Sequence, residues 1–166
     1  LYVSIADVSY FVKPGSAIDK DAYERGTSIY FPGRVIPMLP EKLSNNLCSL
    51  IPEQDRLAVT AVIDFDSSGN RIGKECCRSI IRSHRRFTYT TVRKILIDKD
   101  PAVTSEHTQF LDMLENASAL ATLLQRQRAD RGSIAFSIPE PEISLDQEGK
   151  IAKINKAERN FAHQLI

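Results

Sequence analysis

The stretch LAVTAVIDFDSSGNRIGKECCRSIIRS, Leu57–Ser83, contains two β-prone segments on either side of a short polar loop. The segments are Leu57–Phe65 and Arg71–Ser83, and the first is rich in β-branched residues. The five residues between them, Asp66–Asn70, are Asp, Ser, Ser, Gly and Asn, which all favour turns. This pattern predicts an antiparallel hairpin.

Upstream of the hairpin the expected elements are shorter. Tyr2–Val12 is rich in Val, Ile and Tyr, which predicts a buried strand. Asp19–Arg25 predicts a short helix with Gly26 as its C-terminal cap. Pro32–Pro52 contains four prolines, so it cannot form one long regular element.

Downstream of the hairpin the sequence predicts two helices. Thr90–Ile97 reads as a short helix with Thr90 or Thr91 as its N-cap. Pro101–Arg131 carries the strongest helical pattern of the chain, because apolar residues recur there at spacings of three and four. These residues are Phe110, Leu114, Ala117, Ala121 and Leu124.

The last part of the chain mixes strand and helix patterns. Ser133–Ile138 predicts a strand, Ile143–Leu145 and Ile151–Ile154 predict a second hairpin, and Ala157–Ile166 predicts a helix. The elements do not follow a regular βαβ alternation. The order therefore indicates an α+β fold class, with a mixed, largely antiparallel β-sheet and helices packed on it.

Length and composition restrict the class of protein only in part. A chain of 166 residues suits one domain, and 22 Lys and Arg against 21 Asp and Glu leave the partners open. The apolar runs are too short for a membrane span and no secretory leader is present, so we expect a cytoplasmic protein without a membrane partner. The sequence opens inside an expected strand at Leu1 and closes inside an expected helix at Ile166. We interpret residues 1–166 as a domain truncated at both ends.

Most familiar catalytic patterns are missing. The sequence has no Gly-rich phosphate loop, no H-E-x-x-H and no G-x-S-x-G. The three cysteines and three histidines have no spacing typical of metal ligands. Asp7 has no second carboxylate near it in the sequence, and we interpret it as a cap or a hydrogen-bonded structural group. The residues themselves predict no metal site.

One segment suggests contact with nucleic acid. Eight basic residues and a single acidic residue lie between Arg71 and Ile95. Arg78 and Arg82 share strand parity with Lys74, so one face of this strand can present a basic row to RNA phosphates. Arg85 follows closely and is a further candidate phosphate contact. The alternative is a basic strand face that is only solvated, and the sequence favours neither.

Two aromatic residues are candidates for stacking on bases. Tyr30 and Phe136 lie where expected strands meet loops marked by Pro or Gly. Stacking on an aromatic ring contributes about 1–3 kcal/mol per base and does not depend on base identity. The alternative is that both rings pack in the core, which composition alone favours.

A longer match changes this balance. RGTSIYFPGRVIPMLPEKLSNNLCSL, Arg25–Leu50, closely resembles the signature stretch of the ribonuclease II / ribonuclease R family. IADVSYFV at Ile5–Val12, RFTYTTV at Arg86–Val92, RGSIAF at Arg131–Phe136 and AERNFAHQLI at Ala157–Ile166 resemble other family segments in family order. The form of IADVSYFV is similar to the ribonuclease R branch.

The resemblance implies a function and a fold. It implies part of an RNB catalytic domain, from a processive, magnesium-dependent 3′→5′ exoribonuclease that degrades single-stranded RNA to nucleoside 5′-monophosphates. It also implies that Tyr30 and Phe136 clamp the last nucleotides. The family's four aspartates match a position upstream of Leu1, and its catalytic arginine and a further glutamate match positions downstream of Ile166.

The resemblance therefore implies magnesium in the parent enzyme and neither metal nor activity in residues 1–166 alone. Two alternatives stay open: a non-catalytic RNA-binding module, and an interaction domain whose basic strand is only solvated. Strand edges exposed by truncation would also allow the fragment to self-associate.

Overall fold

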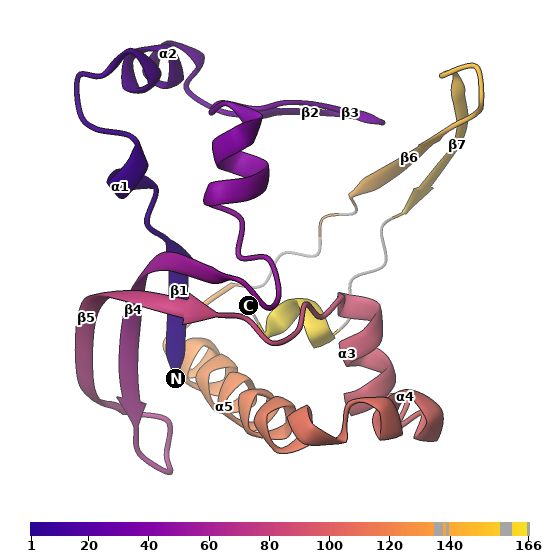
Figure 1. Ribbon diagram of the computed structural model, residues 1–166. Helices are drawn as coiled ribbons and strands as arrows, with labels where there is room; N and C mark the ends of the chain where they lie inside the picture. The colour runs from indigo at the N-terminus through magenta and orange to yellow at the C-terminus, as the bar shows by residue number, and fades with distance from the viewer. Residues whose placement is uncertain (135–137, 139, 157–160, 166) are drawn as a thin grey trace. The chain divides into compact units, whose positions relative to one another are not determined.

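The computed structural model describes residues 1–134, 138, 140–156 and 161–165 (Figure 1). The chain forms two compact units. Unit 1 consists of Leu1–Asp64, Arg71–Arg86 and Ile143–Ile154, and unit 2 of Phe65–Asn70, Phe87–Glu142 and Asn155–Ile166. Helices and antiparallel strands are both abundant, which confirms the expected α+β class.

Unit 1 is built on a three-stranded sheet with the order β1-β4-β5. Strands β4 (Asp55–Phe65) and β5 (Arg71–Arg82) form the predicted hairpin. Strand β1 (Tyr2–Ala6) pairs antiparallel with β4 and places Ser4 opposite Thr60. Three hydroxyl groups meet across the sheet, because the Thr60 hydroxyl lies 2.8 Å from that of Ser4 and 2.6 Å from that of Ser79.

The predicted buried strand Tyr2–Val12 is wrong beyond Ala6, and the part that forms is largely exposed, with Tyr2 76% and Ile5 67% exposed. The chain turns at Asp7 into the short helix α1 (Val8–Phe11), and the Asp7 carboxylate accepts a hydrogen bond from the Tyr10 amide as its N-cap. A side chain that satisfies a helix amide in this way gives the backbone an alternative to strand pairing. The β-prone composition of the segment does not reveal that a capped helix competes with the strand here.

The next elements of unit 1 follow the sequence closely. Helix α2 (Ala17–Arg25) ends at Gly26, which has the positive φ of +70° expected of a C-terminal cap. Strands β2 (Ile29–Phe31) and β3 (Arg34–Ile36) form a tight antiparallel hairpin (Figure 1). The proline-rich segment beyond it contains only one short π-helix, η1 (Lys42–Leu47).

Unit 2 is mainly helical. Helix α3 (Tyr89–Leu96) is capped by Thr88, whose hydroxyl accepts a hydrogen bond from the Thr91 amide. The predicted caps Thr90 and Thr91 are therefore wrong by two or three residues, a common error because several neighbouring threonines can all accept such a bond.

The predicted helix Pro101–Arg131 is interrupted. Helix α4 (Pro101–Glu106) ends at His107, and the 3-10 turn η2 (Thr108–Phe110) leads into α5 (Leu111–Asp130). His107 leaves helical geometry at φ −123° and ψ 19°. Its buried ring has Nδ1 2.9 Å from the Val103 carbonyl oxygen and lies beside the ring of Phe87. Burial of this ring explains a break that the apolar periodicity does not reveal.

The buried core of unit 2 joins α3, α5 and the C-terminal 3-10 turn η3 (Phe161–Gln164). It consists of Val92, Ile95, Leu114 and Ala162. Phe87 and Phe110 pack against it and meet edge to face, with ring centroids 5.4 Å apart. The helical face predicted around Leu114 therefore does face the core.

The remaining predicted elements are partly outside the described residues. The second hairpin is confirmed as β6 (Pro141–Leu145) and β7 (Ile151–Lys156). In the predicted strand Ser133–Ile138, residues 133, 134 and 138 are not in a strand and 135–137 are not described. In the predicted helix Ala157–Ile166, η3 is described, whereas residues 157–160 and 166 are not. Among the described helices, none combines the length and apolar character needed to cross a membrane.

Candidate nucleic-acid interface

Tyr30 lies at the centre of the β2–β3 hairpin. It pairs with Val35, and the Met38 amide donates to the Ser28 hydroxyl across the base of the hairpin. Gly33 has φ +73°, a conformation that glycine adopts without strain at a tight turn. Tyr30 is 77% exposed, so the ring does not pack in the core of the described residues. An exposed ring on a hydrogen-bonded hairpin can stack on a base.

Phe136, the second predicted stacking residue, lies outside the described residues. The predicted clamp therefore remains a prediction. The neighbouring Ile134 is 74% exposed.

Arg78 on β5 forms an ion pair with Asp7. The Nε atom of Arg78 lies 3.4 Å from Oδ2 of Asp7. The Asp7 side chain is almost fully buried, whereas 75% of the Arg78 side chain is exposed. This pair therefore joins a buried anion to a guanidinium group that faces solvent.

Asp7 is held by several groups at once. Its Oδ1 atom accepts hydrogen bonds of 2.5 Å from the Ser9 hydroxyl and 3.2 Å from the Tyr10 amide. The Ser9 bond is the main cause of a lowered pKa of Asp7; burial opposes the shift, while the charge of Arg78 and the Tyr10 amide add to it. Asp7 is thus a stable carboxylate at neutral pH. The expectation that it is a cap and a hydrogen-bonded structural group is confirmed.

Arg82 is also held by neighbours within unit 1. Its Nε lies 3.8 Å from Asp55 Oδ1, and its Nη2 donates a 3.0 Å hydrogen bond to the Glu53 carbonyl oxygen. The Glu53 side chain lies 3.4 Å from His84 Nδ1. Acidic groups from distant segments therefore accompany the basic strand. The proposed phosphate contacts of Arg78, Arg82 and Arg85 stay predictions.

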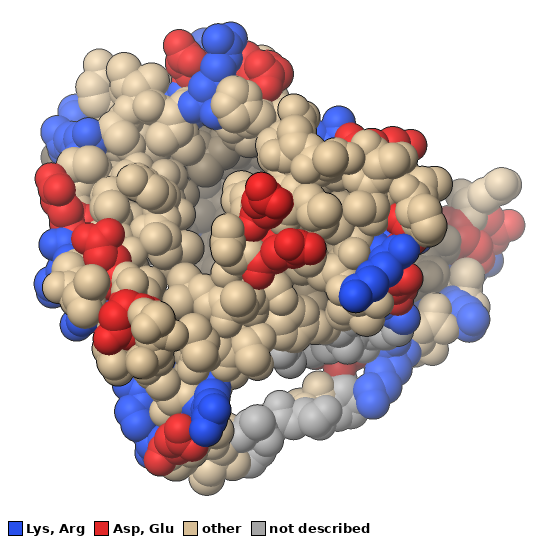
Figure 2. Space-filling model, turned by 90° about the horizontal axis from the view of Figure 1, so that it is seen from below, with Lys and Arg blue, Asp and Glu red and all other residues tan. Residues whose placement is uncertain are grey.

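Sequence reasoning missed these acidic partners. The basic segment was assessed by the acids within residues 71–95, whereas Asp7 and Asp55 reach arginines of β5 from elsewhere in the chain. Figure 2 shows acidic and basic side chains interspersed over the face in view, in keeping with the nearly balanced composition. Binding of a polyanion must therefore depend on the local placement of individual groups.

Comparison with known proteins gives the family. The sequence profile of the RNB domain matches residues 1–166. The chain belongs to the RNB domain family. It is 43% identical to ribonuclease R of Aquifex aeolicus and 42% identical to ribonuclease R of Escherichia coli, in both cases over 166 residues and 100% of this chain.

The solved structures of RNB proteins agree. The structure of Mycoplasma genitalium RNase R in complex with ribose-methylated single-stranded RNA matches 99% of this chain, with 39% identity and a TM-score of 0.88. The matched part is 25% of that chain. The present chain likewise spans 23% of the Aquifex protein and 20% of the Escherichia protein.

The described residues of this RNB domain do not form a metal centre. No group of three or more His, Cys, Asp or Glu side chains that could hold an ion occurs among them. Asp7 is already engaged by Ser9, Tyr10 and Arg78. The residues present therefore do not fit a magnesium site.

Cys48 does not have the properties of a nucleophilic thiol. Burial raises the pKa of the Cys48 thiol, and the negative charge of Asp7 adds to this effect. A thiol with a raised pKa stays protonated at neutral pH and is a poor nucleophile. Cys48 is best explained as a packing residue.

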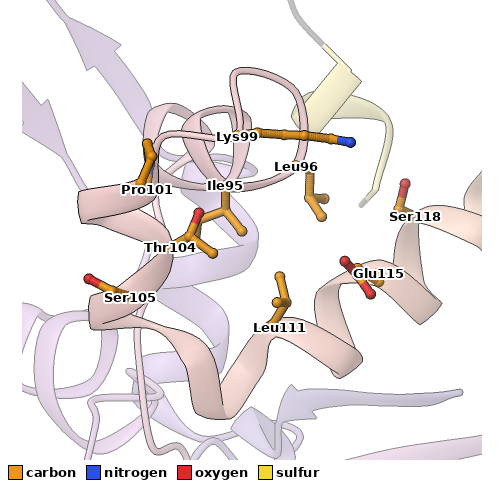
Figure 3. Close-up of a pocket in the computed structure, with 9 residues that line it drawn as sticks. All are labelled: Ile95, Leu96, Lys99, Pro101, Thr104, Ser105, Leu111, Glu115 and Ser118. Atoms are coloured by element: carbon orange, nitrogen blue, oxygen red, sulfur yellow. The ribbon is translucent and has the colours of Figure 1, made fainter.

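Unit 2 contains an open pocket of about 560 Å³ (Figure 3). Ile95, Leu96 and Leu111 line it, and Lys99 and Glu115 are the charged residues of its lining. Its lining thus has a single carboxylate and no histidine, so it carries no set of converging catalytic groups. The exposed surface of unit 1 is the better candidate for function.

Proposed function

We propose that the protein containing this chain is a processive hydrolytic 3′→5′ exoribonuclease that degrades single-stranded RNA to nucleoside 5′-monophosphates. The observation that carries the proposal is the match of the whole chain to the RNB domain at about 40% identity to proteins named ribonuclease R. The relatives are four to five times as long as this chain, since it covers 20–23% of them. Activity, substrate and partners are proposed for that whole protein.

In this proposal the chain holds the RNA. Tyr30 presents an exposed ring from the paired strands β2 and β3, and Phe136 is its proposed partner in clamping the last nucleotides. Arg78, Arg82 and Arg85 are proposed phosphate contacts, which would act without regard to sequence. Stacking and phosphate contacts together suit an enzyme that accepts every base.

Magnesium is proposed for the parent enzyme only. The carboxylates that a two-metal hydrolysis requires are not gathered among the described residues, so these residues by themselves support no metal-dependent step. We expect the metal ligands in a part of the protein outside residues 1–166, and a location in the cytoplasm.

The first test uses single-stranded RNA labelled at its 5′ end, with magnesium. The whole protein should produce a ladder of products shortened from the 3′ end. Residues 1–166 alone should leave the RNA intact, and trimming by this chain would overturn the assignment of its role.

The second test separates stacking from packing. Tyr30→Ala in the whole protein should raise the Kd for single-stranded RNA by about fivefold to a hundredfold, as expected for the loss of one base stack. Tyr23→Ala is the matched control, because Tyr23 is 88% exposed but lies on α2 outside the hairpin. Equal affinities of both variants would remove Tyr30 from the proposed site.

A non-catalytic RNA-binding module is the second candidate. The absence of a metal-binding cluster among the described residues favours it over an active nuclease if the rest of the protein also lacks one. Retained binding without trimming by the whole protein would select this alternative.

Self-association of residues 1–166 is a further proposal. Among the described strands, β1 pairs only with β4, so its other edge is open to a strand of a second copy. Sedimentation of the isolated chain tests this proposal.

A further inference from the structure

Arg78 differs from a typical surface arginine because a buried carboxylate holds it at one end. The Asp7 side chain is almost fully buried and is fixed by Ser9 and by the backbone of Tyr10. Its Oδ2 atom faces Arg78 Nε, whereas Oδ1 accepts both hydrogen bonds. The anchor of the arginine is therefore rigid and has one oxygen directed toward it.

The remaining donors of Arg78 face solvent. Among the described residues, no acceptor forms a hydrogen bond with its two Nη atoms, and 75% of its side chain is exposed. A guanidinium group has five N–H donors in a fixed planar arrangement that matches the oxygens of a phosphate. Contact with Asp7 through Nε leaves the Nη side of this arrangement for a second anion.

We propose that Asp7 is a positioning residue for RNA binding: it orients Arg78 so that the two Nη atoms of the guanidinium group bind a phosphate of single-stranded RNA. The inference rests on the proposed function. Asp7 itself does not contact the RNA. Because Asp7 already restricts the Arg78 side chain, this side chain loses less conformational entropy when it binds a phosphate.

The direction in which Asp7→Asn changes RNA affinity distinguishes a purely electrostatic role of Asp7 from a positioning role. If Asp7 acts only through its charge, Asp7→Asn removes a negative group near the RNA and strengthens binding. If Asp7 orients Arg78, the same change releases the guanidinium group and weakens binding. Asparagine is as good an N-cap as aspartate, so the start of α1 is preserved.

The experiment uses the whole protein and a fluorescent single-stranded oligoadenylate, without magnesium so that the RNA stays intact. Arg78→Ala should weaken binding roughly tenfold, and the slope of log K against log salt should become shallower by about 0.7, the value for one phosphate contact on a single strand. Arg71→Ala is the matched control, because Arg71 is an exposed arginine of β5 with the opposite strand parity.

Asp7→Asn should weaken binding of the same RNA about threefold, and it should have no further effect in an Arg78→Ala background, because both changes remove one contact. Stronger or unchanged binding by a folded Asp7→Asn protein would overturn the positioning role. Far-UV circular dichroism checks that the variant folds.

Arg78→Lys keeps the test decisive if Asp7→Asn does not fold. Lysine keeps the charge but has a single ammonium group, which cannot pair with Asp7 and present a planar pair of donors to the phosphate. Binding should fall close to the level of Arg78→Ala, and wild-type affinity would overturn the inference. Failure of the wild-type protein to bind RNA would instead reject the proposed function.

Discussion

Unit 1 and the helices of unit 2 differ in where their large apolar side chains lie. In unit 2 the buried residues include Val92, Ile95 and Leu114, and Met113 is the most exposed large apolar residue of helices α3, α4 and α5. In unit 1 the buried apolar residues are Ala22, Leu43 and Ala58. Several large side chains of unit 1 are about two-thirds exposed or more: Tyr2, Ile5, Tyr23, Tyr30, Ile72 and Ile80.

This difference suggests that apolar side chains stabilise the helices of unit 2, whereas many of those in unit 1 are available to contact a partner. Buried aliphatic groups stabilise a fold in proportion to the apolar area that they remove from water. Buried apolar residues therefore stabilise the helices of unit 2 more than they stabilise unit 1. An exposed apolar surface contributes little to the fold and is typical of regions that contact a partner. Unit 1 also carries Tyr30 and Arg78, which are proposed to contact RNA, and Asp7, which is proposed to position Arg78.

The largest expected effect is on the core of unit 2. Leu114→Ala should lower the free energy of unfolding by about 2–5 kcal/mol, because it leaves a cavity among Val92, Ile95 and Ala162. Urea unfolding of the chain, followed by circular dichroism, measures this. Met113→Ala, at the adjacent and 55% exposed position, should change the stability little. Equal losses at both positions would break the comparison between buried and exposed apolar groups.

The next effect concerns the polar interior of unit 1. Thr60→Val keeps the shape of the buried side chain but removes the hydroxyl that meets those of Ser4 and Ser79. We expect the free energy of unfolding to fall by about 1–2 kcal/mol, since the two serines lose their shared partner. Ser67→Ala in the exposed loop serves as the control. A stabilising Thr60→Val would show that this sheet tolerates an apolar interior.

The third effect is a pH dependence of stability at Asp7. The pKa of Asp7 is lowered in the folded protein from its ordinary value of 3.8, mainly by the Ser9 hydroxyl. Its contribution to stability is therefore complete above pH 3.8 and is lost as the pH falls through the lower, folded-state pKa.

The measurement is the difference in unfolding free energy between wild type and Asp7→Asn across acidic pH. This difference should be constant near neutral pH and should shrink below 3.8. The pKa of Asp66 is also lowered, chiefly by hydrogen bonds from Asn70. Asp66 is present in both proteins, so its contribution cancels in this difference. Asp64→Asn on β4 is the control, and a pH-independent difference for Asp7→Asn would contradict the role given to the ionised carboxylate.

The smallest expected effect is at Tyr30. Because the ring is 77% exposed, Tyr30→Ala should change the free energy of unfolding by no more than about 0.5 kcal/mol. Thermal unfolding of the wild-type and variant chains measures this. A loss as large as that of Leu114→Ala would show that Tyr30 stabilises the fold, and its effect on RNA binding would then need a different explanation.

Several elements could be predicted from the sequence because their signals are local. Alternating β-prone residues and a turn-forming loop predict the β4–β5 hairpin, and Gly26 predicts the end of α2. Two expectations were wrong for a common reason. Asp7 ends β1 by capping α1, and the buried ring of His107 accompanies the break between α4 and α5. Polar side chains that bond to nearby backbone groups compete with the regular patterns around them.

The candidate site was only partly visible in the sequence. Tyr30 could be named from the resemblance of its segment to a family signature, but the sequence could not decide between stacking and core packing. The exposure of the ring speaks against packing in the core of the described residues, and stacking on a base stays a prediction. The sequence indicated that Arg78 is a basic residue of a strand and that Asp7 is a structural carboxylate. It did not indicate that the two residues form an ion pair.

The sequence by itself determined the family, the main hairpin, the apolar face of α5 and the position of the tyrosine, because each depends on residues that are close together in the chain. Only the tertiary structure decided that Tyr30 is exposed and that Asp7 holds Arg78. The pairing of β1 with β4, beside β5, brings Asp7 and Arg78 together across a long stretch of chain. Coulomb attraction depends on distance in space and not on separation in sequence, so this ion pair has no local signal.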